Sequence, residues 1–120
     1  MQEQKTIVIV EDDQDNSELL NEVFTEEFSN VLVFNCGLKA LENIIKIKPH
    51  LILTDVSLPG LSGVEMVKKV REEGITSPVI FQTGHSVLEI EKEINALSKC
   101  KIISKPYDFD ALLSLAREQI

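Results

Sequence analysis

The residues best suited to chemistry follow short apolar runs along the chain. An acidic run begins at Glu11-Asp12, an aspartate stands at Asp55, a hydroxyl at Thr83 and an amine at Lys105. Ionised aspartate can attack phosphorus and form an acyl phosphate. Phosphoryl transfer needs a nucleophile, a cation, and donors that stabilise the charge on the equatorial oxygens. Asp55, a cation held by Glu11 and Asp12, the Thr83 hydroxyl and the Lys105 ammonium would supply each part once.

The acidic run predicts a hard cation. Two carboxylates about 4 Å apart repel each other by on the order of 4 kcal/mol at an effective dielectric constant near 20. If Asp55 converges on Glu11 and Asp12, positive charge must therefore join them. Magnesium binds through one or a few carboxylates and keeps several waters, whereas a transition metal would favour His or Cys, and neither lies nearby in the sequence. Taken singly, the run could instead be a solvated acidic turn, and Asp55 the start of a loop.

Short runs rich in β-branched residues predict the strands that would position these groups. The predicted strands are Thr6–Val10, Val31–Phe34, Leu51–Thr54, Val79–Gln82 and Lys101–Ile103. Apolar residues at helical spacing lie after each of them and predict five amphipathic helices. This alternation predicts an α/β fold with a doubly wound parallel sheet. Ligands of such sheets bind beyond the carboxyl ends of the strands, where the polar groups would stand.

Helix starts are predicted where a short acceptor is followed three residues later by glutamate. The predicted pairs are Asp15 with Glu18, Ser62 with Glu65, and Ser86 with Glu89. With the caps so assigned, Glu11, Asp12 and Asp55 are not needed for capping, and their carboxylates remain for another role.

Composition predicts a single globular domain over residues 1–120. The chain has 120 residues, 43% of them hydrophobic and 27% charged, which is ordinary for one domain. Its net charge of -8 argues against direct binding to nucleic acid. The apolar run Ile7–Val10 is too short for a signal peptide or a membrane span, so a cytoplasmic location without a membrane partner is expected. Cys36 and Cys100 lack metal-ligand spacing and are predicted to be structural thiols.

These motifs resemble the landmarks of response-regulator receiver domains, in order along essentially the full chain. Residues 7–13 resemble the first strand and acidic pair of that family, and residues 53–63 resemble its phosphoacceptor segment. Gln82-Thr83-Gly84 resembles its switch hydroxyl, and Lys105-Pro106 resembles its lysine and a proline whose peptide bond is often cis. The resemblance implies a flavodoxin-like fold with strand order 2-1-3-4-5 and five helices.

The resemblance also implies a function in two-component signalling. Asp55 would accept a phosphoryl group from a histidine kinase or a histidine phosphotransfer protein, with Mg²⁺ as cofactor. The implied metal ligands are Glu11, Asp12, Asp55 and the backbone carbonyl of Ser57, and Thr83 and Lys105 would contact the phosphoryl group. The domain would catalyse only its own phosphorylation and dephosphorylation, and the added charge would switch partner binding near the fourth helix and fifth strand. The cognate kinase, the output and the oligomeric state are not predicted.

Some positions depart from the receiver pattern. Ile102 stands where receivers usually have Tyr or Phe, which puts an aromatic switch in doubt. Gly84 replaces the common alanine and predicts a wider space beside the phosphoryl group. His85 lies close enough in the family's arrangement to influence hydrolysis of the acyl phosphate, although a surface loop histidine is the alternative.

Three other functions remain as alternatives. Asp13-Gln14-Asp15-Asn16-Ser17 matches the loose D-x-D-x-S/T pattern of haloacid-dehalogenase-type phosphotransferases, but that pattern leaves Asp55 without a role. A flavin mononucleotide carrier of the same topology is disfavoured because the acidic run would repel its phosphate. A receiver-like interaction module that is not phosphorylated is the third.

Overall fold

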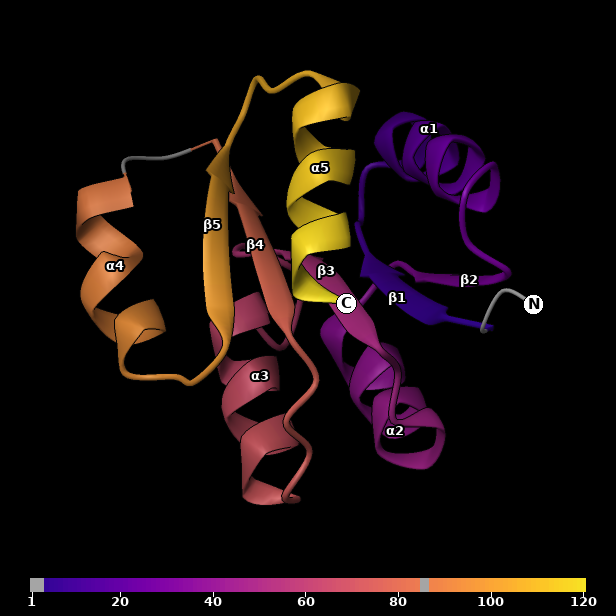
Figure 1. The fold of residues 1–120 in the computed structure, drawn as a ribbon. Coiled ribbons are helices and arrows are strands. Elements are labelled where there is room, and N and C mark those ends of the chain that lie inside the picture. Colours follow the sequence, from indigo (N-terminus) through magenta and orange to yellow (C-terminus); the bar gives the residue numbers. More distant parts are fainter. Residues whose placement is uncertain (1–3, 85–86) are drawn as a thin grey trace.

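In the computed structural model, which describes residues 4–84 and 87–120, five parallel strands form a sheet flanked by helices (Figure 1). The strand order is β2-β1-β3-β4-β5, as predicted. The strands are β1 (Thr6–Val10), β2 (Asn30–Phe34), β3 (Leu51–Asp55), β4 (Val79–Thr83) and β5 (Cys100–Ser104). The helices are α1 (Gln14–Thr25), α2 (Gly37–Ile47), α3 (Gly63–Glu72), α4 (Val87–Asn95) and α5 (Phe109–Gln119). The α/β fold class is confirmed, and β3 and β4 each run one residue further than predicted.

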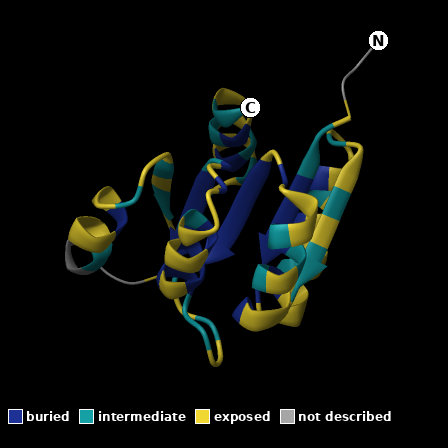
Figure 2. Ribbon diagram, turned by 90° about the horizontal axis from the view of Figure 1, so that it is seen from below, coloured by how far each residue is buried: buried dark blue, intermediate teal, exposed yellow. Residues whose placement is uncertain are grey.

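Helices cover both faces of the sheet because its inner strands are apolar on both sides. Successive residues of a strand point to opposite faces. Ile9 and Leu53 pack with Phe24 of α1 and with α5, whereas Val10 and Phe81 pack against α2, α3 and α4. The inner strands β1, β3 and β4 are buried, while the edge strands β2 and β5 are more exposed (Figure 2). No helix within the described residues is long and apolar enough to cross a membrane.

The start of α1 differs from the prediction. Asp13, and not Asp15, caps this helix: its backbone is extended, and its Oδ1 accepts a hydrogen bond of 3.0 Å from the Asn16 N–H. Asp15 lies inside the first turn, where its charge is still favourable beside the positive end of the helix dipole. Ser62 caps α3 as predicted: its hydroxyl oxygen accepts from the Glu65 N–H at 3.2 Å, and the hydroxyl donates to Oε1 of Glu65 at 3.1 Å. The predicted cap at Ser86 lies outside the described residues.

Gly63, the first residue of α3, lies directly against the backbone of Asp55. Its N–H donates to the Val56 carbonyl at 2.9 Å. A Cβ added at Gly63 would lie 2.0 Å from the carbonyl oxygen of Asp55. The absence of a side chain here therefore allows α3 to pack against the end of β3.

We expect Gly63→Ala to lower the free energy of unfolding by about 3 kcal/mol, because the added carbon would force apart two backbone segments. Gly84→Ala is the matched control, since an added Cβ at Gly84 meets nothing within 4 Å. Urea unfolding of both variants measures the difference. Equal stability of the two variants would contradict the close packing of Gly63 on Asp55.

Candidate metal and phosphoacceptor site

Strands β1 and β3 bring three carboxylates to one edge of the sheet. Val10 pairs with Thr54, so the next residues, Glu11 and Asp55, follow side by side. Carboxylate oxygens of Glu11, Asp12 and Asp55 lie within 4.8 Å of one another. Glu11 and Asp55 are buried, while Asp12 is exposed. The structure thus brings together the three acidic residues singled out from the sequence.

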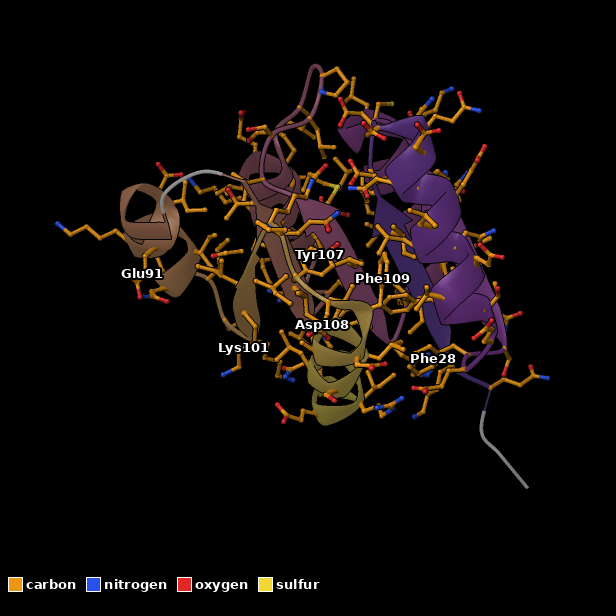
Figure 3. The ribbon with its side chains drawn as sticks, turned by 90° about the horizontal axis from the view of Figure 1, so that it is seen from above. Phe28, Glu91, Lys101, Tyr107, Asp108 and Phe109 are labelled. Atoms are coloured by element: carbon orange, nitrogen blue, oxygen red, sulfur yellow. The ribbon has the colours of Figure 1, made fainter. Side chains whose placement is uncertain are left out.

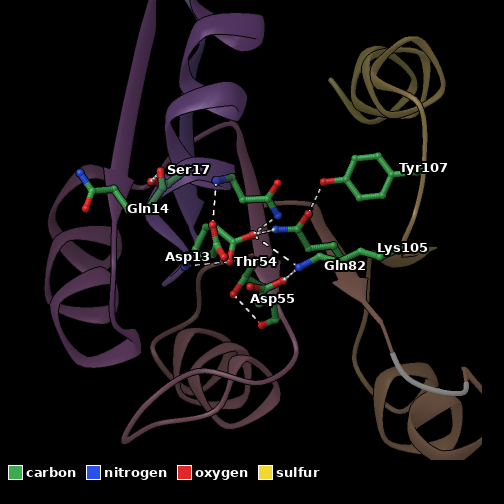
Figure 4. A network of polar contacts seen from close by, with 10 residues as sticks. Asp13, Gln14, Ser17, Thr54, Asp55, Gln82, Lys105 and Tyr107 are labelled. Carbon is green, nitrogen blue, oxygen red and sulfur yellow. Dashed lines mark hydrogen bonds and ion pairs between the residues drawn. The ribbon is translucent and has the colours of Figure 1, made fainter.

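Lys105 supplies positive charge between two of these carboxylates (Figure 4). Its Nζ lies 2.9 Å from Oδ1 of Asp55 and 3.5 Å from Oε1 of Glu11. The Lys105 N–H donates to the Thr83 carbonyl at 2.7 Å, which joins the lysine to the end of β4, and the Lys105–Pro106 peptide bond is cis. Because buried carboxylates need a paired charge or donors, the lysine stabilises this cluster.

Asp55, Glu11 and Lys105 shift one another's pKa values. Burial and the hydrogen bond with Glu11 raise the pKa of Asp55 to about 8, against the opposing effect of Lys105. Burial alone would raise the pKa of Glu11, but hydrogen bonds from Asp55 and from the Asp13 N–H, together with the charge of Lys105, lower it overall. Burial alone would lower the pKa of Lys105, yet its contacts with Asp55 and Glu11 raise it. Without a cation, burial and Glu11 therefore favour the protonated form of Asp55, while Lys105 favours the ionised form of Glu11.

The raised pKa of Asp55 predicts that cation binding depends on pH. A metal ligand must be deprotonated, so binding below the pKa releases one proton. With the pKa of Asp55 at about 8, we expect the affinity for Mg²⁺ to rise about tenfold per pH unit from about pH 6 to about pH 8 and to level off above. Titration calorimetry across this range measures the slope. An affinity that does not change with pH would contradict the raised pKa of Asp55, and Asp55→Asn, which has no proton to release, is the control.

A cavity of about 250 Å³ opens beside Asp55. It is lined by Asp55, Ser57, Gln82, Thr83, Gly84 and Lys105. Thr83 is buried and Ser57 is exposed. Among the described residues, no atom lies within 4 Å of a Cβ added at Gly84. A larger cavity, of about 450 Å³, lies around His50 and Ser77 and contains none of the predicted site residues.

The hydrogen bonds that surround Glu11 were not predicted from the sequence. Oε1 of Glu11 accepts hydrogen bonds from Asn16 Nδ2 at 2.9 Å and from Gln82 Nε2 at 3.1 Å. The Tyr107 hydroxyl donates to Oε1 of Gln82. The available signal was a glutamine, Gln82, directly after the apolar run Val79–Phe81 of β4.

The remaining sequence predictions concern residues near the site. Ile102 is half-buried and packs against the core on the side of α2, α3 and α4. Cys36 and Cys100 are free thiols, both half-buried. His85 lies outside the described residues.

Comparison with known proteins places this arrangement in a family. The model of the response regulator receiver domain matches residues 7–117. The chain is 31% identical over 114 residues to sporulation initiation phosphotransferase F of Bacillus subtilis, covering 95% of this chain and 92% of that protein. It is 32% identical over 111 residues to the transcriptional regulatory protein PcoR of Escherichia coli, covering 92% of this chain but 49% of PcoR.

Solved structures agree in fold. The chemotaxis response regulator CheY4 of Vibrio cholerae superposes with a TM-score of 0.88 at 22% identity, covering 98% of this chain and 100% of that chain. The receiver domain of the sensor histidine kinase PA1611 from Pseudomonas aeruginosa, solved with a magnesium ion in its active site cleft, gives a TM-score of 0.85 at 20% identity and covers 98% of each chain. With its family model, its relatives and its fold in agreement, this chain belongs to the response regulator receiver domains, which are signalling domains.

Proposed function

We propose that this receiver domain accepts a phosphoryl group on Asp55 in a reaction that requires Mg²⁺. The observation that carries the proposal is the cluster of Glu11, Asp12 and Asp55 oxygens within 4.8 Å of one another. Thr83 and Lys105 line the adjacent cavity with Asp55. Phosphorylation of an aspartate with Mg²⁺ is the standard function of receiver domains.

The proposed magnesium ligands are Glu11, Asp12, Asp55 and the backbone carbonyl of Ser57. This set fits the ion because all its donors are oxygens, with no His or Cys among them. Asp12 is exposed, which leaves room for the waters that magnesium retains. The magnesium in the PA1611 receiver domain also supports the assignment. When bound, Mg²⁺ would supply positive charge for the phosphoryl oxygens.

The proposed reaction is a direct displacement at phosphorus. An oxygen of ionised Asp55 forms a bond to phosphorus while the bond from phosphorus to the donor's imidazole nitrogen breaks, and the electron pair of that bond leaves with the donor. Lys105, whose Nζ lies 2.9 Å from Asp55, would donate to the phosphoryl oxygens. The Thr83 hydroxyl would donate from the end of β4. The product is an acyl phosphate that adds about 1.5 to 2 negative charges at neutral pH.

The proposed donor is a histidine kinase or a histidine phosphotransfer protein, and the proposed output is a change of binding partner. Sporulation initiation phosphotransferase F, named for phosphoryl transfer, supports the first part. We propose one domain over residues 1–120 that catalyses only its own phosphorylation and dephosphorylation. A cytoplasmic location stays a prediction of the sequence.

Mass spectrometry of the intact protein tests the proposal against an interaction module that is not phosphorylated. After treatment with acetyl phosphate and Mg²⁺, the protein should gain the mass of one phosphoryl group, and chelation of Mg²⁺ should prevent the gain. An unchanged mass with Mg²⁺ would favour the interaction module. The haloacid-dehalogenase-type alternative, whose pattern begins at Asp13, fits less well, because Asp13 caps α1 through its side chain.

A further inference from the structure

Gln82 is a buried amide within an apolar strand, directly beside the candidate metal site. Its side chain is fully buried, and it pairs in register with Asp55 of β3. Ile80, two residues earlier, packs on the face covered by α1 and α5, so Gln82 points to that same face. An apolar residue could fill such a core position without the cost of burying an amide, which is offset only when its polar groups are hydrogen-bonded.

Both ends of the Gln82 amide are occupied (Figure 4). Its Nε2 donates to Oε1 of Glu11 at 3.1 Å, and its Oε1 accepts from the Tyr107 hydroxyl. An ionised carboxylate can only accept, so the amide nitrogen must face Glu11 and the amide oxygen must face Tyr107. The charge of Glu11 therefore sets the direction of the whole chain of hydrogen bonds.

These contacts hold Glu11 from several directions. Asn16 Nδ2 donates to the same oxygen as Gln82, at 2.9 Å, and the Asp13 N–H donates to the other oxygen at 3.3 Å. The Tyr107 and Phe109 side chains lie next to each other (Figure 3). Their rings pack edge-on, with centroids 6.1 Å apart. A packed aromatic pair after β5 is thus connected through Gln82 to a carboxylate after β1.

We propose that Gln82 is a positioning residue of the metal site, which holds the Glu11 carboxylate in place for the cation and ties it to Tyr107. This inference rests on the proposed binding of Mg²⁺. Groups that hydrogen-bond to metal ligands orient them, and their loss typically weakens metal binding 10- to 100-fold. Gln82 has the burial, the direction and the fixed second contact that such a role needs.

The test replaces Gln82 with methionine, which has a similar length but neither donates nor accepts a strong hydrogen bond. We expect Gln82→Met to raise the Kd for Mg²⁺ about tenfold. Gln119→Met, at the far end of α5, is the matched control and should leave the Kd unchanged. Tyr107→Phe keeps the bond from Gln82 to Glu11 but frees the amide oxygen, so it should raise the Kd by about threefold.

Two readouts separate positioning from a general structural role. A structural role alone would lower stability equally with and without Mg²⁺, whereas a positioning role reduces the stabilisation gained when Mg²⁺ is added. Tyr107 is the only tyrosine, and the chain has no tryptophan, so near-ultraviolet absorption reports on Tyr107 directly. Mg²⁺ should perturb this absorption in the parent protein, and Gln82→Met saturated with Mg²⁺ should lose the perturbation.

The outcomes distinguish this inference from the proposed function. If Gln82→Met binds Mg²⁺ within about twofold of the parent while Asp12→Asn binds weakly, the positioning role is overturned and the metal site stands. If the parent protein does not bind Mg²⁺, both fail. Should Gln82→Met not fold, Tyr107→Phe decides, and an unchanged Kd in that variant overturns the role.

Discussion

Replacing Asp12 with asparagine should weaken Mg²⁺ binding by roughly 30-fold, because losing one ligand charge beside a divalent cation costs on the order of 2 kcal/mol. The Asp12 carboxylate lies within 4.8 Å of those of Glu11 and Asp55. Asp12 is also exposed, so the substitution removes charge without opening a cavity in the core.

Asp13→Asn is the matched control, since it removes the same charge one residue later. Asp13 caps α1 by accepting from the Asn16 N–H, and asparagine caps helices about as well as aspartate. The Kd for Mg²⁺ should therefore change by no more than about twofold in this variant, given screening by solvent. Calorimetric titration of Mg²⁺ into both variants measures the two Kd values. Equal losses would mean that the acidic run is assigned one residue out of register.

Lys105→Ala should slow phosphorylation by acetyl phosphate on the order of 100-fold, the usual cost of removing one donor to developing negative charge. The Lys105 Nζ lies between Asp55 and Glu11, at 2.9 Å and 3.5 Å. Mg²⁺ binding should persist, because the lysine is itself a cation and contributes no ligand. Any phosphorylated protein that does form should also signal poorly, since its phosphoryl oxygens lack this partner.

Lys101→Ala provides the comparison for Lys105. Lys101 is an exposed lysine on β5 (Figure 3), so its loss removes the same charge outside the site. Rates of phosphorylation followed by intact mass, together with the Kd for Mg²⁺, separate the two variants. Complete loss of Mg²⁺ binding in Lys105→Ala would contradict the role assigned to this lysine.

The sheet could be predicted because its signals are local. Runs such as Ile7–Val10 and Leu51–Leu53 are apolar at every position, and the structure buries them on both faces. The carboxyl-end rule for parallel sheets then predicted that Glu11 and Asp55 would meet. The boundaries were less certain, since Asp55 and Thr83 turned out to be the last residues of their strands.

The start of α1 shows where a local pattern has two solutions. Asp13 with Asn16 and Asp15 with Glu18 both place an acceptor three residues before a polar residue. Only the point at which the chain leaves β1 decides between them, and it places Asp13 at the cap. The same choice gives Asp12 and Asp13 different roles, although they are neighbours of the same type.

The contacts around Glu11 could not be predicted because they join distant parts of the chain. Gln82 lies 71 residues from Glu11, and Tyr107 lies 25 residues from Gln82. No spacing rule connects such positions before the sheet order is known. That phosphorylation changes partner binding without burying an aromatic ring at position 102 stays a prediction. In the structure, Ile102 packs against the core beside α4.

The most direct test of the account is to locate the phosphoryl group. The protein is treated with acetyl phosphate and Mg²⁺, the acyl phosphate is reduced with borohydride, and the modified residue is identified by mass spectrometry of peptides. Modification at Asp55, and its loss in Asp55→Asn, is the predicted result. A phosphoryl group found on Asp12, Asp13 or any residue other than Asp55, or one that persists in Asp55→Asn, would contradict the account.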